Sequence, residues 1–419
     1  MPNNEFDVVI IGAGQAGLAV SYYLSRSRIN HVIFEQGVIA NAWRNERWDS
    51  FCLVTPNWSI NLPGAVYEGD NPHGFMKRDE FVNYMEEWSK KFDAPVREGI
   101  KVTKVRKIQD HFLIETDQGS FSAIQVIVAT ATYQQPHVPC IFKKLDPKID
   151  LLTAVEYRNP SKISEGGILV VGSGQSGCQI AEELNRSGRR TFLSVGHTGR
   201  LPRRYRGADC IQWQLEMGWL DRTPDLLAYP ELRFRGDPHL SGSDGGRTLS
   251  LHQLRREGVR LLGRVETIKG GVLKIKKDLK SAVDASDKYA EEFRQTVDEY
   301  IKTLGLAAPQ AKPDEMLGEP MVGDEDLKII AELDLSSNGI STVILATGFE
   351  FDFSWLKFSV FDQVGYPITN RGATSVPGLY FMGLNWMNKR KSGIIFGVAE
   401  DAKYIESKVK KYNKRSRSS

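Results

Sequence analysis

The chain contains one pattern twice: residues 7–24 read DVVIIGAGQAGLAVSYYL, and residues 167–184 read GILVVGSGQSGCQIAEEL. Each copy runs from an apolar strand pattern through a GxGxxG motif into a helical pattern. This context makes the motif specific for a dinucleotide, whereas the glycines alone are a weak signal. The repeat therefore predicts an α/β chain with two dinucleotide-binding units.

The glycines and the residues between them are the first candidates for cofactor binding. In each motif the first glycine permits a tight turn, the second lets the backbone approach a pyrophosphate, and the third lets the helix pack closely on the strand. Free N–H groups and a partial positive charge at the start of each helix favour phosphate. The candidates are Gly12, Gly14, Gln15, Ala16 and Gly17 in the first motif, and Gly172, Gly174, Gln175, Ser176 and Gly177 in the second.

The two units differ where the second strand of each one ends. In the first unit, the strand at 31–34 is followed by Glu35 and Gln36, and an acid at this place hydrogen-bonds a ribose diol. In the second unit, the strand at 191–194 is followed by Val195, which carries no carboxylate. The arginines beyond it suit a 2′-phosphate or, alternatively, form a solvated surface loop; they are Arg200, Arg203 and Arg204. The first unit therefore predicts a site for FAD or NAD, and the second a site for NADP.

Three further segments are expected to reach the cofactors. Residues 124–130 and 341–348 are similar apolar strands that each run into an Ala-Thr pair, and each fits the last strand of a nucleotide-binding unit. A strand at 378–383 and the next helical pattern place a helix N-terminus where it faces a flavin ring. The candidates from these segments are Ala129, Thr130, Gly348, Gly383, Ser392 and Gly393, with Val102 as a further one. Two different dinucleotide sites in one chain suggest a flavoprotein that takes hydride from NADPH.

The composition excludes several classes of protein. Hydrophobic residues are 41% of the 419 residues and charged residues 26%, which is enough for a core and excludes a disordered chain. The net charge of +3 gives no reason to expect a nucleic-acid partner. No apolar run reaches the roughly 18 residues of a membrane-spanning helix, and the N-terminus lacks the pattern of a secretory signal. We expect a cytoplasmic protein.

The four cysteines indicate no metal site and no redox centre. Cys52, Cys140, Cys178 and Cys210 are widely scattered, and neither they nor the histidines have the spacing of metal ligands. A disulfide reductase needs a close redox-active pair of cysteines, which this sequence lacks. Reduced thiols in a cytosolic protein are the expected state.

The order of the motifs predicts how the domains are arranged. We expect a discontinuous FAD-binding domain at residues 1–158 and 335–410, with an NADP-binding domain at 159–334 inserted into it. Both domains are expected to be Rossmann-like and of the glutathione-reductase type. Prolines mark the first crossing between the domains, and an Asn-Gly turn lies near the second.

Three segments have predictions of their own. Residues 207–262 are rich in Gly, Asp and Arg with little periodicity, which predicts a long surface loop. Apolar residues recur at helical spacing over 284–304, ahead of Gly305, and predict an amphipathic helix that docks on its own domain; a dimer contact and a substrate cap are the alternatives. The tail at 411–419 is basic and Ser-rich, and disorder is expected.

Together these motifs resemble those of the single-component flavin-containing monooxygenases, in particular their bacterial branch. The resemblance spans nearly the whole chain, and the matching segments are GAGQAG at 12–17, Glu35, Ala42-Trp43-Arg44, the segment 48–64, GSGQSG at 172–177, PRRYRG at 202–207 and ATGF at 346–349. More loosely, the chain is similar to predicted flavin oxidoreductases found beside nitrilase genes. The resemblance implies FAD and NADP(H) as cofactors and adds Trp43 and Arg44 to the cofactor-binding candidates.

The resemblance also implies a reaction. In this family NADPH reduces FAD, and the reduced flavin forms a C4a-(hydro)peroxide with O₂ that oxygenates a small molecule, here expected at N or S. The protein orients the cofactors and excludes water. An amide side chain commonly holds the peroxide and the nicotinamide. Asn57 is the catalytic candidate and Asn61 the second choice, while a turn-forming Asn after Pro56 is the alternative.

Several alternatives stay open. The histidine of the family fingerprint corresponds to Thr153, so the alternative function is a flavin NADPH oxidase or reductase that releases H₂O₂ or passes electrons to a partner. Arg390 and Lys391 either bind an anionic substrate group or the nicotinamide end of NADP, or lie in a solvated loop. Trp43 and Trp386 are the aromatic residues expected near a ligand, and a homodimer is the default assembly.

Overall fold

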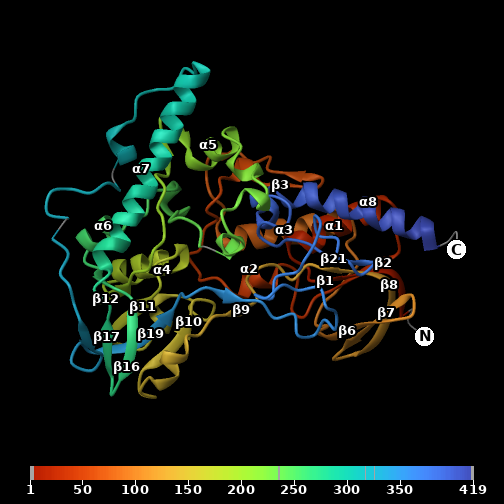
Figure 1. The fold of residues 1–419 in the computed structure, drawn as a ribbon, viewed down its shortest axis with the longest axis horizontal. Helices are drawn as coiled ribbons and strands as arrows, with labels where there is room; N and C mark the ends of the chain where they lie inside the picture. Colours follow the sequence, from red (N-terminus) through yellow and green to blue (C-terminus); the bar gives the residue numbers. More distant parts are fainter. Residues whose placement is uncertain (1–3, 235, 317, 325, 417–419) are drawn as a thin grey trace.

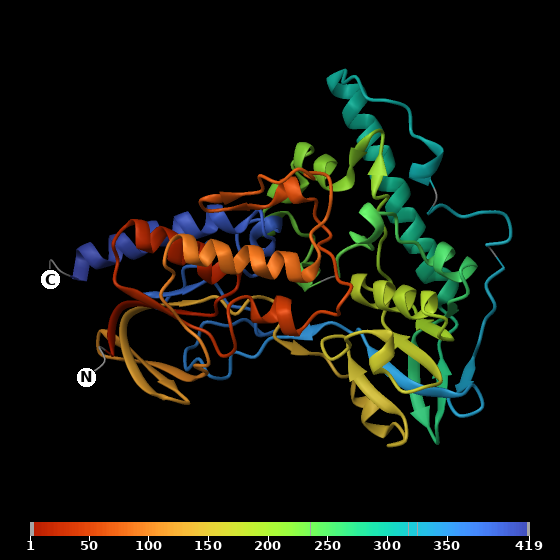
Figure 2. The ribbon, with the colours of Figure 1, turned by 180° about the vertical axis from the view of Figure 1, so that it is seen from behind.

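The chain forms two lobes that lie side by side (Figure 1). The structure is a computed structural model and describes residues 4–234, 236–316, 318–324 and 326–416. One lobe is built on a seven-stranded sheet and the other on a five-stranded sheet. Figure 2 shows that the C-terminal helix α8 (Val398–Ser416) returns to the lobe that contains the N-terminus. This confirms the predicted fold, in which one Rossmann-like unit is inserted into another.

The first sheet has the order β5-β2-β1-β8-β7-β6, and β21 pairs with β8. Strands β2, β1, β8 and β21 are parallel, so Ile11, Phe34 and Val128 end at the same edge of the sheet. Ligands of open α/β sheets bind at this carboxyl edge. The strands are β1 (Glu5–Ile11), β2 (His31–Phe34), β5 (Val96–Arg97), β6 (Val102–Ile108), β7 (His111–Thr116), β8 (Gly119–Val128) and β21 (Leu379–Phe381).

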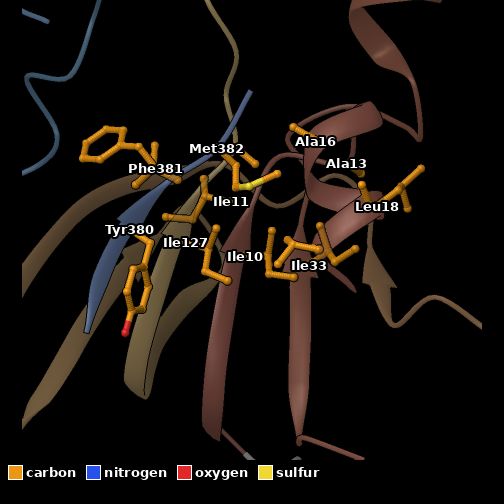
Figure 3. Packing of buried hydrophobic residues seen from close by; sticks show 14 of the residues in the cluster. Ile10, Ile11, Ala13, Ala16, Leu18, Ile33, Ile127, Tyr380, Phe381 and Met382 are labelled. Atoms are coloured by element: carbon orange, nitrogen blue, oxygen red, sulfur yellow. The ribbon is translucent and has the colours of Figure 1, made fainter. Parts of the chain in front are cut away.

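The core of the first lobe lies between this sheet and helices α1 (Gln15–Arg26) and α8. Figure 3 shows aliphatic side chains of neighbouring strands in contact, among them Ile10, Ile33 and Ile127. Phe381 of β21 is also fully buried. Strands that are buried on both faces read as continuous apolar runs, which is why their positions could be predicted.

The second sheet has the order β10-β19-β11-β12-β15, and all its strands are parallel. Helix α4 (Gln175–Arg186) follows β11 and packs against it, as α1 follows β1 in the first lobe. A three-stranded antiparallel sheet of β16 (Val265–Lys269), β17 (Val272–Ile275) and β18 (Glu332–Asp334) adjoins this core. The parallel strands are β10 (Asp150–Thr153), β11 (Gly167–Val171), β12 (Thr191–Ser194), β15 (Arg260–Leu262) and β19 (Ile340–Leu345).

The chain crosses between the lobes at other places than residues 158 and 335. Strands β10 and β19, both expected in the FAD-binding domain, belong to the second sheet because β19 pairs with β11 on one side and β10 on the other. The two crossings are instead β9 (Gln135–Pro136) and β20 (Phe349–Glu350), which pair with each other in antiparallel orientation. Residues 137–348 therefore lie between two paired crossings.

Residues 207–262 are not one long surface loop. They contain β14 (Ala208–Asp209), helix α5 (Cys210–Glu216), helix α6 (Leu251–Arg256) and β15 of the parallel sheet. These elements are too short to show a clear period in the sequence. Their apolar side chains nevertheless reach the core, as the burial of Trp213 shows.

The predicted amphipathic helix is α7, which begins at Leu279 rather than at residue 284 and ends at Leu304. Gly305 follows it in the left-handed conformation, with a φ of 62°. Its residues Phe293, Val297 and Ile301 are buried in a cluster with Trp213 and Leu220 of its own lobe.

The C-terminal tail differs from its prediction. Helix α8 continues to Ser416, so residues 411–416 are helical rather than disordered. Gln125 of β8 donates a hydrogen bond of 2.7 Å to the side chain of Asn413, which attaches this end of the helix to the sheet. Residues 417–419 of the predicted tail lie outside the described residues.

The remaining elements are short or lie at the surface of the lobes. The helices are α2 (Asn41–Asn45) and α3 (Arg78–Lys91), and the strands are β3 (Asn61–Leu62), β4 (Ala65–Val66) and β13 (Arg204–Tyr205). The 3-10 helices are η1 (Asn57–Ser59), η2 (Cys140–Lys144), η3 (Pro160–Lys162), η4 (Trp219–Asp221), η5 (Pro224–Leu226), η6 (Pro230–Phe234), η7 (Ser243–Gly245), η8 (Pro313–Met316) and η9 (Arg390–Gly393). Among the described residues, no helix combines the length and the apolar character needed to cross a membrane.

The burial of β21 generates a stability prediction. Phe381→Ala should lower the free energy of unfolding by about 3–5 kcal/mol, because it leaves a cavity in the core of the first lobe. Ile368→Ala is the control, since Ile368 is 62% exposed and its loss should change stability by less than about 0.5 kcal/mol. Urea unfolding followed by circular dichroism measures both. An equal effect in the two variants would show that β21 is not part of the core.

Candidate functional site

Two adjoining cavities lie at the carboxyl edge of the parallel strands. The smaller one, of about 300 Å³, is in the first lobe beside the first glycine motif. The larger one, of about 600 Å³, is lined by residues of both lobes and is called the interdomain cavity below. The cavities share four residues, which are Gln15, Trp43, Glu46 and Tyr133. The two cavities therefore adjoin at these four residues, between the first glycine motif and the space between the lobes.

The smaller cavity collects most of the predicted residues of the first unit, although they come from distant parts of the chain. The predicted residues on its wall are Gly12, Gly14, Gln15, Ala16, Glu35, Gln36, Trp43, Val102, Ala129, Thr130 and Gly383. They follow β1, β2, β8 and β21 or begin α1 and β6, except Trp43, which lies in α2. Gly17 is not on the wall, because it faces the strand beneath the helix.

Glu35 is held in place by the backbone around it. Its carboxylate accepts hydrogen bonds from the N–H groups of Ala13, at 2.8 Å, and Gly37, at 2.9 Å. The residue is 8% exposed and lies on the wall of the smaller cavity. A carboxylate has about four acceptor positions, so it can also accept hydrogen bonds from a ribose diol.

The first glycine motif has the geometry of a diphosphate cradle. A Cβ on Gly17 would lie 1.9 Å from the carbonyl oxygen of Gly12, so this glycine is required by the packing of α1 on β1. Gly12 has a φ of 106°, and a Cβ on it would lie 2.7 Å from the carbonyl oxygen of Ala129. Gly14 has a φ of −81°, which any residue adopts, and a Cβ on it would meet no protein atom within 4 Å. The packing of the protein therefore does not require a glycine at this position, and the space beside Gly14 can hold a ligand.

The second motif repeats this geometry. A Cβ on Gly177 would lie 1.8 Å from the oxygen of Gly172, and one on Gly172 would lie 2.4 Å from the oxygen of Ala346. Gly174 again faces open space and has an ordinary φ of −70°. Residues Gly174, Gln175 and Ser176 line the interdomain cavity, so the second cradle opens toward the first.

The sequence and the structure place the chain among known flavoproteins. Residues 9–206 match a family model described as pyridine nucleotide-disulphide oxidoreductase. A CzcO-like oxidoreductase of Geobacillus kaustophilus is 33% identical, over 95% of this chain and 97% of the relative. The probable indole-3-pyruvate monooxygenase YUCCA3 of Arabidopsis thaliana is 26% identical over 45% of each chain. A flavin-containing monooxygenase from Stenotrophomonas maltophilia has a similar structure, with a TM-score of 0.65, 19% identity and coverage of 98% of this chain and 99% of that one.

The chain belongs to the same family as the CzcO-like oxidoreductase, and it shares its fold with the flavin-containing monooxygenase. It is an FAD-dependent oxidoreductase whose cofactors are FAD and NADP(H), as the sequence predicts. The four cysteines of this flavoprotein are free, and Cys178 and Cys210 are buried. The disulphide chemistry in the name of the family model therefore has no cysteine pair to support it in the described structure.

The interdomain cavity of the flavoprotein brings further predicted residues together. Gly348 and Gly393 line it with the second cradle, and Trp386 is also on its wall. Gln15 connects its two sides, because its side chain accepts a hydrogen bond from the Trp43 indole at 2.9 Å and donates one to the carbonyl oxygen of Gly393 at 3.3 Å. The segment before α8 is thereby held against the first glycine motif.

The three arginines expected at a 2′-phosphate have protein partners instead. The Arg200 side chain is 1% exposed and donates hydrogen bonds to Asp287, at 2.9 Å, and to both oxygens of Glu319, at 2.8 and 2.9 Å. Burial by itself raises the pKa of Glu319, but hydrogen bonds and charge from Arg200 and Arg294 hold it below its usual value. Asp287 belongs to α7, and Glu319 to the segment after it. Both are remote in sequence from β12, so the residues near β12 could not indicate these partners.

Arg203 and Arg204 brace the loops between the lobes. Arg203 pairs with Asp209 at 2.5 Å and donates to the carbonyl oxygen of Val54, in the other lobe, at 2.8 Å. Arg204 donates to the carbonyl oxygens of Gly246, at 2.7 Å, and Gly245, at 2.9 Å. We therefore assign none of the three arginines to NADP.

Further predicted residues also lie outside the walls of both cavities, and they include Gly172 and Gly177 of the second motif. The Asn57 amide donates to the carbonyl oxygen of Asn71 at 3.0 Å and accepts from the N–H of Met76 at 2.8 Å, so it braces a loop, as the turn alternative expects. Arg44 pairs with Glu86. The Ser392 hydroxyl accepts hydrogen bonds from two backbone N–H groups at 3.2 and 3.0 Å and shapes η9. Asn61, the second choice for the catalytic amide, is exposed on β3.

The two cations before α8 are also neutralised by carboxylates. Lys391 lies 2.8 Å from Asp221, and Arg390 pairs with Asp237. Hydrogen bonds from Lys391 and Lys389 lower the pKa of Asp221, although its burial acts in the opposite direction. Neither cation is therefore a free charge at the cavity.

Glu46, Arg47 and His239 are not among the residues predicted from the sequence. Glu46 and Arg47 follow Trp43 closely, and their proximity to that tryptophan was the signal that could have identified them. Burial raises the pKa of Glu46, and the charge of Arg47 offsets only part of this effect. His239 is fully buried and bonds through Nε2 to the carbonyl oxygen of Ser173 at 2.5 Å, inside the second glycine motif. Burial lowers the pKa of His239 to about 4, so it is a neutral donor near pH 7.

The open space at the two middle glycines generates a paired prediction. Gly14→Ala should yield a colourless protein, because its Cβ occupies the space of the FAD pyrophosphate. Gly174→Ala should stay yellow but be reduced by NADPH about a hundredfold more slowly, because the nicotinamide is misplaced. Flavin absorbance per protein and stopped-flow reduction measure these effects. A colourless Gly174→Ala protein would reverse the assignment of the two sites.

The ion pairs of Arg200 generate a further prediction. Arg200→Met should lower the free energy of unfolding by about 3–5 kcal/mol, because it leaves buried carboxylates without a partner. The ratio of the flavin reduction rates with NADPH and NADH should not change. A stable variant that has lost its preference for NADPH would show that Arg200 binds the 2′-phosphate after all.

Proposed function

We propose that this flavoprotein is an NADPH-dependent flavin monooxygenase that oxygenates a small molecule in the interdomain cavity. The observation that carries the proposal is that the two open glycine cradles line two adjoining cavities that share part of their walls. A flavin that extends from the first cradle and a nicotinamide that extends from the second would meet between the lobes. The small molecule and O₂ are the co-reactants, and N or S is the atom that we expect to be oxygenated.

The residues of the smaller cavity would hold FAD. Backbone N–H groups at the start of α1 would bind the pyrophosphate beside Gly14, and Glu35 would accept hydrogen bonds from the ribose. Gln15 and Trp43 line both cavities, so they would orient the part of the cofactor that lies at the boundary between the cavities. When bound, the flavin supplies the redox chemistry, which is to take a hydride from NADPH and to activate O₂.

The second cradle would hold NADP(H) in the orientation that reduction needs. Gly174 leaves room for its pyrophosphate, and the helix α4 N-terminus favours the negative charge. His239 fixes the loop through its bond to Ser173. Because it stays neutral near pH 7, it adds no charge next to the phosphates.

The walls of the interdomain cavity would exclude water from the reaction. They are formed largely by apolar and aromatic side chains from both lobes, and an apolar enclosure suppresses side reactions of a reactive intermediate with water. The wall residues of this kind include Trp48, Phe51, Leu53, Leu220, Leu232, Phe349, Trp386, Ile394 and Phe396. An apolar wall of this kind would favour oxygen transfer to a bound molecule over release of H₂O₂.

The test separates a monooxygenase from an oxidase or reductase. The holoenzyme is supplied with NADPH, isotopically labelled O₂ and a set of probes, such as an aryl methyl thioether and a tertiary aromatic amine. We expect labelled product and less H₂O₂ than NADPH consumed. Gly174→Ala is the control, because its flavin should accept electrons from dithionite but only slowly from NADPH. Release of H₂O₂ equal to the NADPH consumed, with every probe unchanged, would favour the oxidase.

The cellular location and the assembly of the flavoprotein stay predictions. We propose a cytoplasmic enzyme that forms a homodimer and binds no nucleic acid. Sedimentation of the holoenzyme measures the assembly directly.

A further inference from the structure

Arg47 carries a positive charge at the wall of the interdomain cavity. It lies between α2 and Trp48, and its guanidinium carbon is 5.4 Å from the ring centroid of Trp43, 5.9 Å from that of Phe51 and 6.0 Å from that of Tyr133. Three aromatic rings therefore fix the position of the side chain. Rings at these distances attract the cation but satisfy none of its N–H groups.

Among the described residues, the Arg47 guanidinium has few protein partners for hydrogen bonds. Nη1 donates to the carbonyl oxygen of Glu46 at 2.9 Å. Within the described residues, no carboxylate lies at ion-pair distance from Arg47. This differs from Arg200, Arg203 and Arg390, which all pair with carboxylates. Taking a guanidinium out of water is costly unless an anion and hydrogen bonds compensate for it.

The other charged groups at this cavity do not supply the missing anion. Asp237 is paired with Arg390. The Glu46 carboxyl lies outside ion-pair distance of Arg47, and burial raises its pKa, which weakens its tendency to be charged. Arg222 stacks on Trp219, with its guanidinium carbon 4.7 Å from the ring centroid, but it is exposed to solvent. Among the described residues of this cavity, Arg47 is therefore a partly buried cation that no carboxylate approaches to ion-pair distance, although the charge of Glu46 attracts it from farther away.

The position of Arg47 also separates it from the two diphosphate cradles. It lines the interdomain cavity but not the smaller cavity where FAD would bind, and its chain lies in the first lobe, opposite the second cradle. Arg47 therefore lies on the wall of the cavity in which the small molecule would bind beside the nicotinamide end of NADP(H). A guanidinium presents its donors as a planar fork that binds a carboxylate through two hydrogen bonds.

We propose that Arg47 is a specificity-determining residue that binds the anionic group of the substrate, and that the substrate joins a carboxylate to an aromatic or aliphatic body. The body is inferred from the apolar wall, which includes Trp48, Phe51 and Phe349. The cavity of about 600 Å³ is of the size that small-molecule sites usually have. This inference rests on the proposed function, because it names the substrate class of the same site.

The test compares three ligands of nearly equal shape on the oxidised holoenzyme. 3-Phenylpropanoate is the anion, 3-phenylpropanamide is its neutral counterpart, and 3-phenylpropylamine is the cation. Perturbation of the flavin absorbance or calorimetry gives each dissociation constant without turnover. We expect the anion to bind about tenfold to a hundredfold more tightly than the amide, as one charge-assisted interaction provides. Equal binding of the anion and the amide would overturn the proposal.

Variants identify the residue that is responsible. Arg47→Met should reduce the preference for the anion to less than about threefold, and Arg47→Lys should keep part of it, because a charge remains but the planar fork is lost. Arg222→Met removes an exposed arginine of the same cavity and should leave the preference unchanged. If Arg222→Met lost the preference for the anion and Arg47→Met kept it, the anion would bind at Arg222. This result would overturn the proposed role of Arg47.

The same variants distinguish this inference from the proposed function. In Arg47→Met, the FAD content and the rate of reduction by NADPH should match those of the unaltered flavoprotein. A loss of FAD or of NADPH binding would show that Arg47 serves a cofactor, which overturns the inference. Failure of oxygen transfer with an intact anion preference would contradict only the proposed function.

Discussion

The close approach of helix α1 to strand β1 is the constraint on which the rest of this flavoprotein depends. Gly17 rests so near the carbonyl oxygen of Gly12 that no side chain fits between them. This contact fixes the direction of the helix, and the helix in turn aims its free N–H groups at the carboxyl edge of the sheet. The same contact recurs between Gly177 and Gly172, so one local arrangement sets the position of both cradles.

Two cradles become one site only because the lobes face each other across a shared cavity. Gln15 and Gln175, at equivalent places in the two motifs, both line that cavity. Arg203 of one lobe reaches the backbone of the other at Val54, which helps to hold this arrangement. The cavity wall is largely apolar, and a charge acts more strongly in an apolar surrounding than in water. The proposed role of Arg47 as the group that selects an anion depends on this surrounding.

Local features of this fold could be predicted from the sequence, because they depend on neighbours in the chain. The strands at 31–34 and 191–194 have the same bounds in the structure as in the prediction. The roles of Arg200 and Asn57 could not be predicted, because their partners come from elements that are remote in sequence. Arg200 meets Asp287 and Glu319, and no spacing around β12 indicates those carboxylates. For the same reason the unpaired state of Arg47 is visible only in three dimensions.

The paired crossings β9 and β20 have a consequence for how such a protein could arise. Because these two strands lie side by side, the second lobe leaves and rejoins the first at one point. A segment with neighbouring ends can be inserted into a host domain, or lost from it, without rearranging the host sheet. The second nucleotide-binding unit therefore has neighbouring ends, as a segment that is inserted into another domain needs. The similar motifs at 12–17 and 172–177 fit an origin by duplication of one unit.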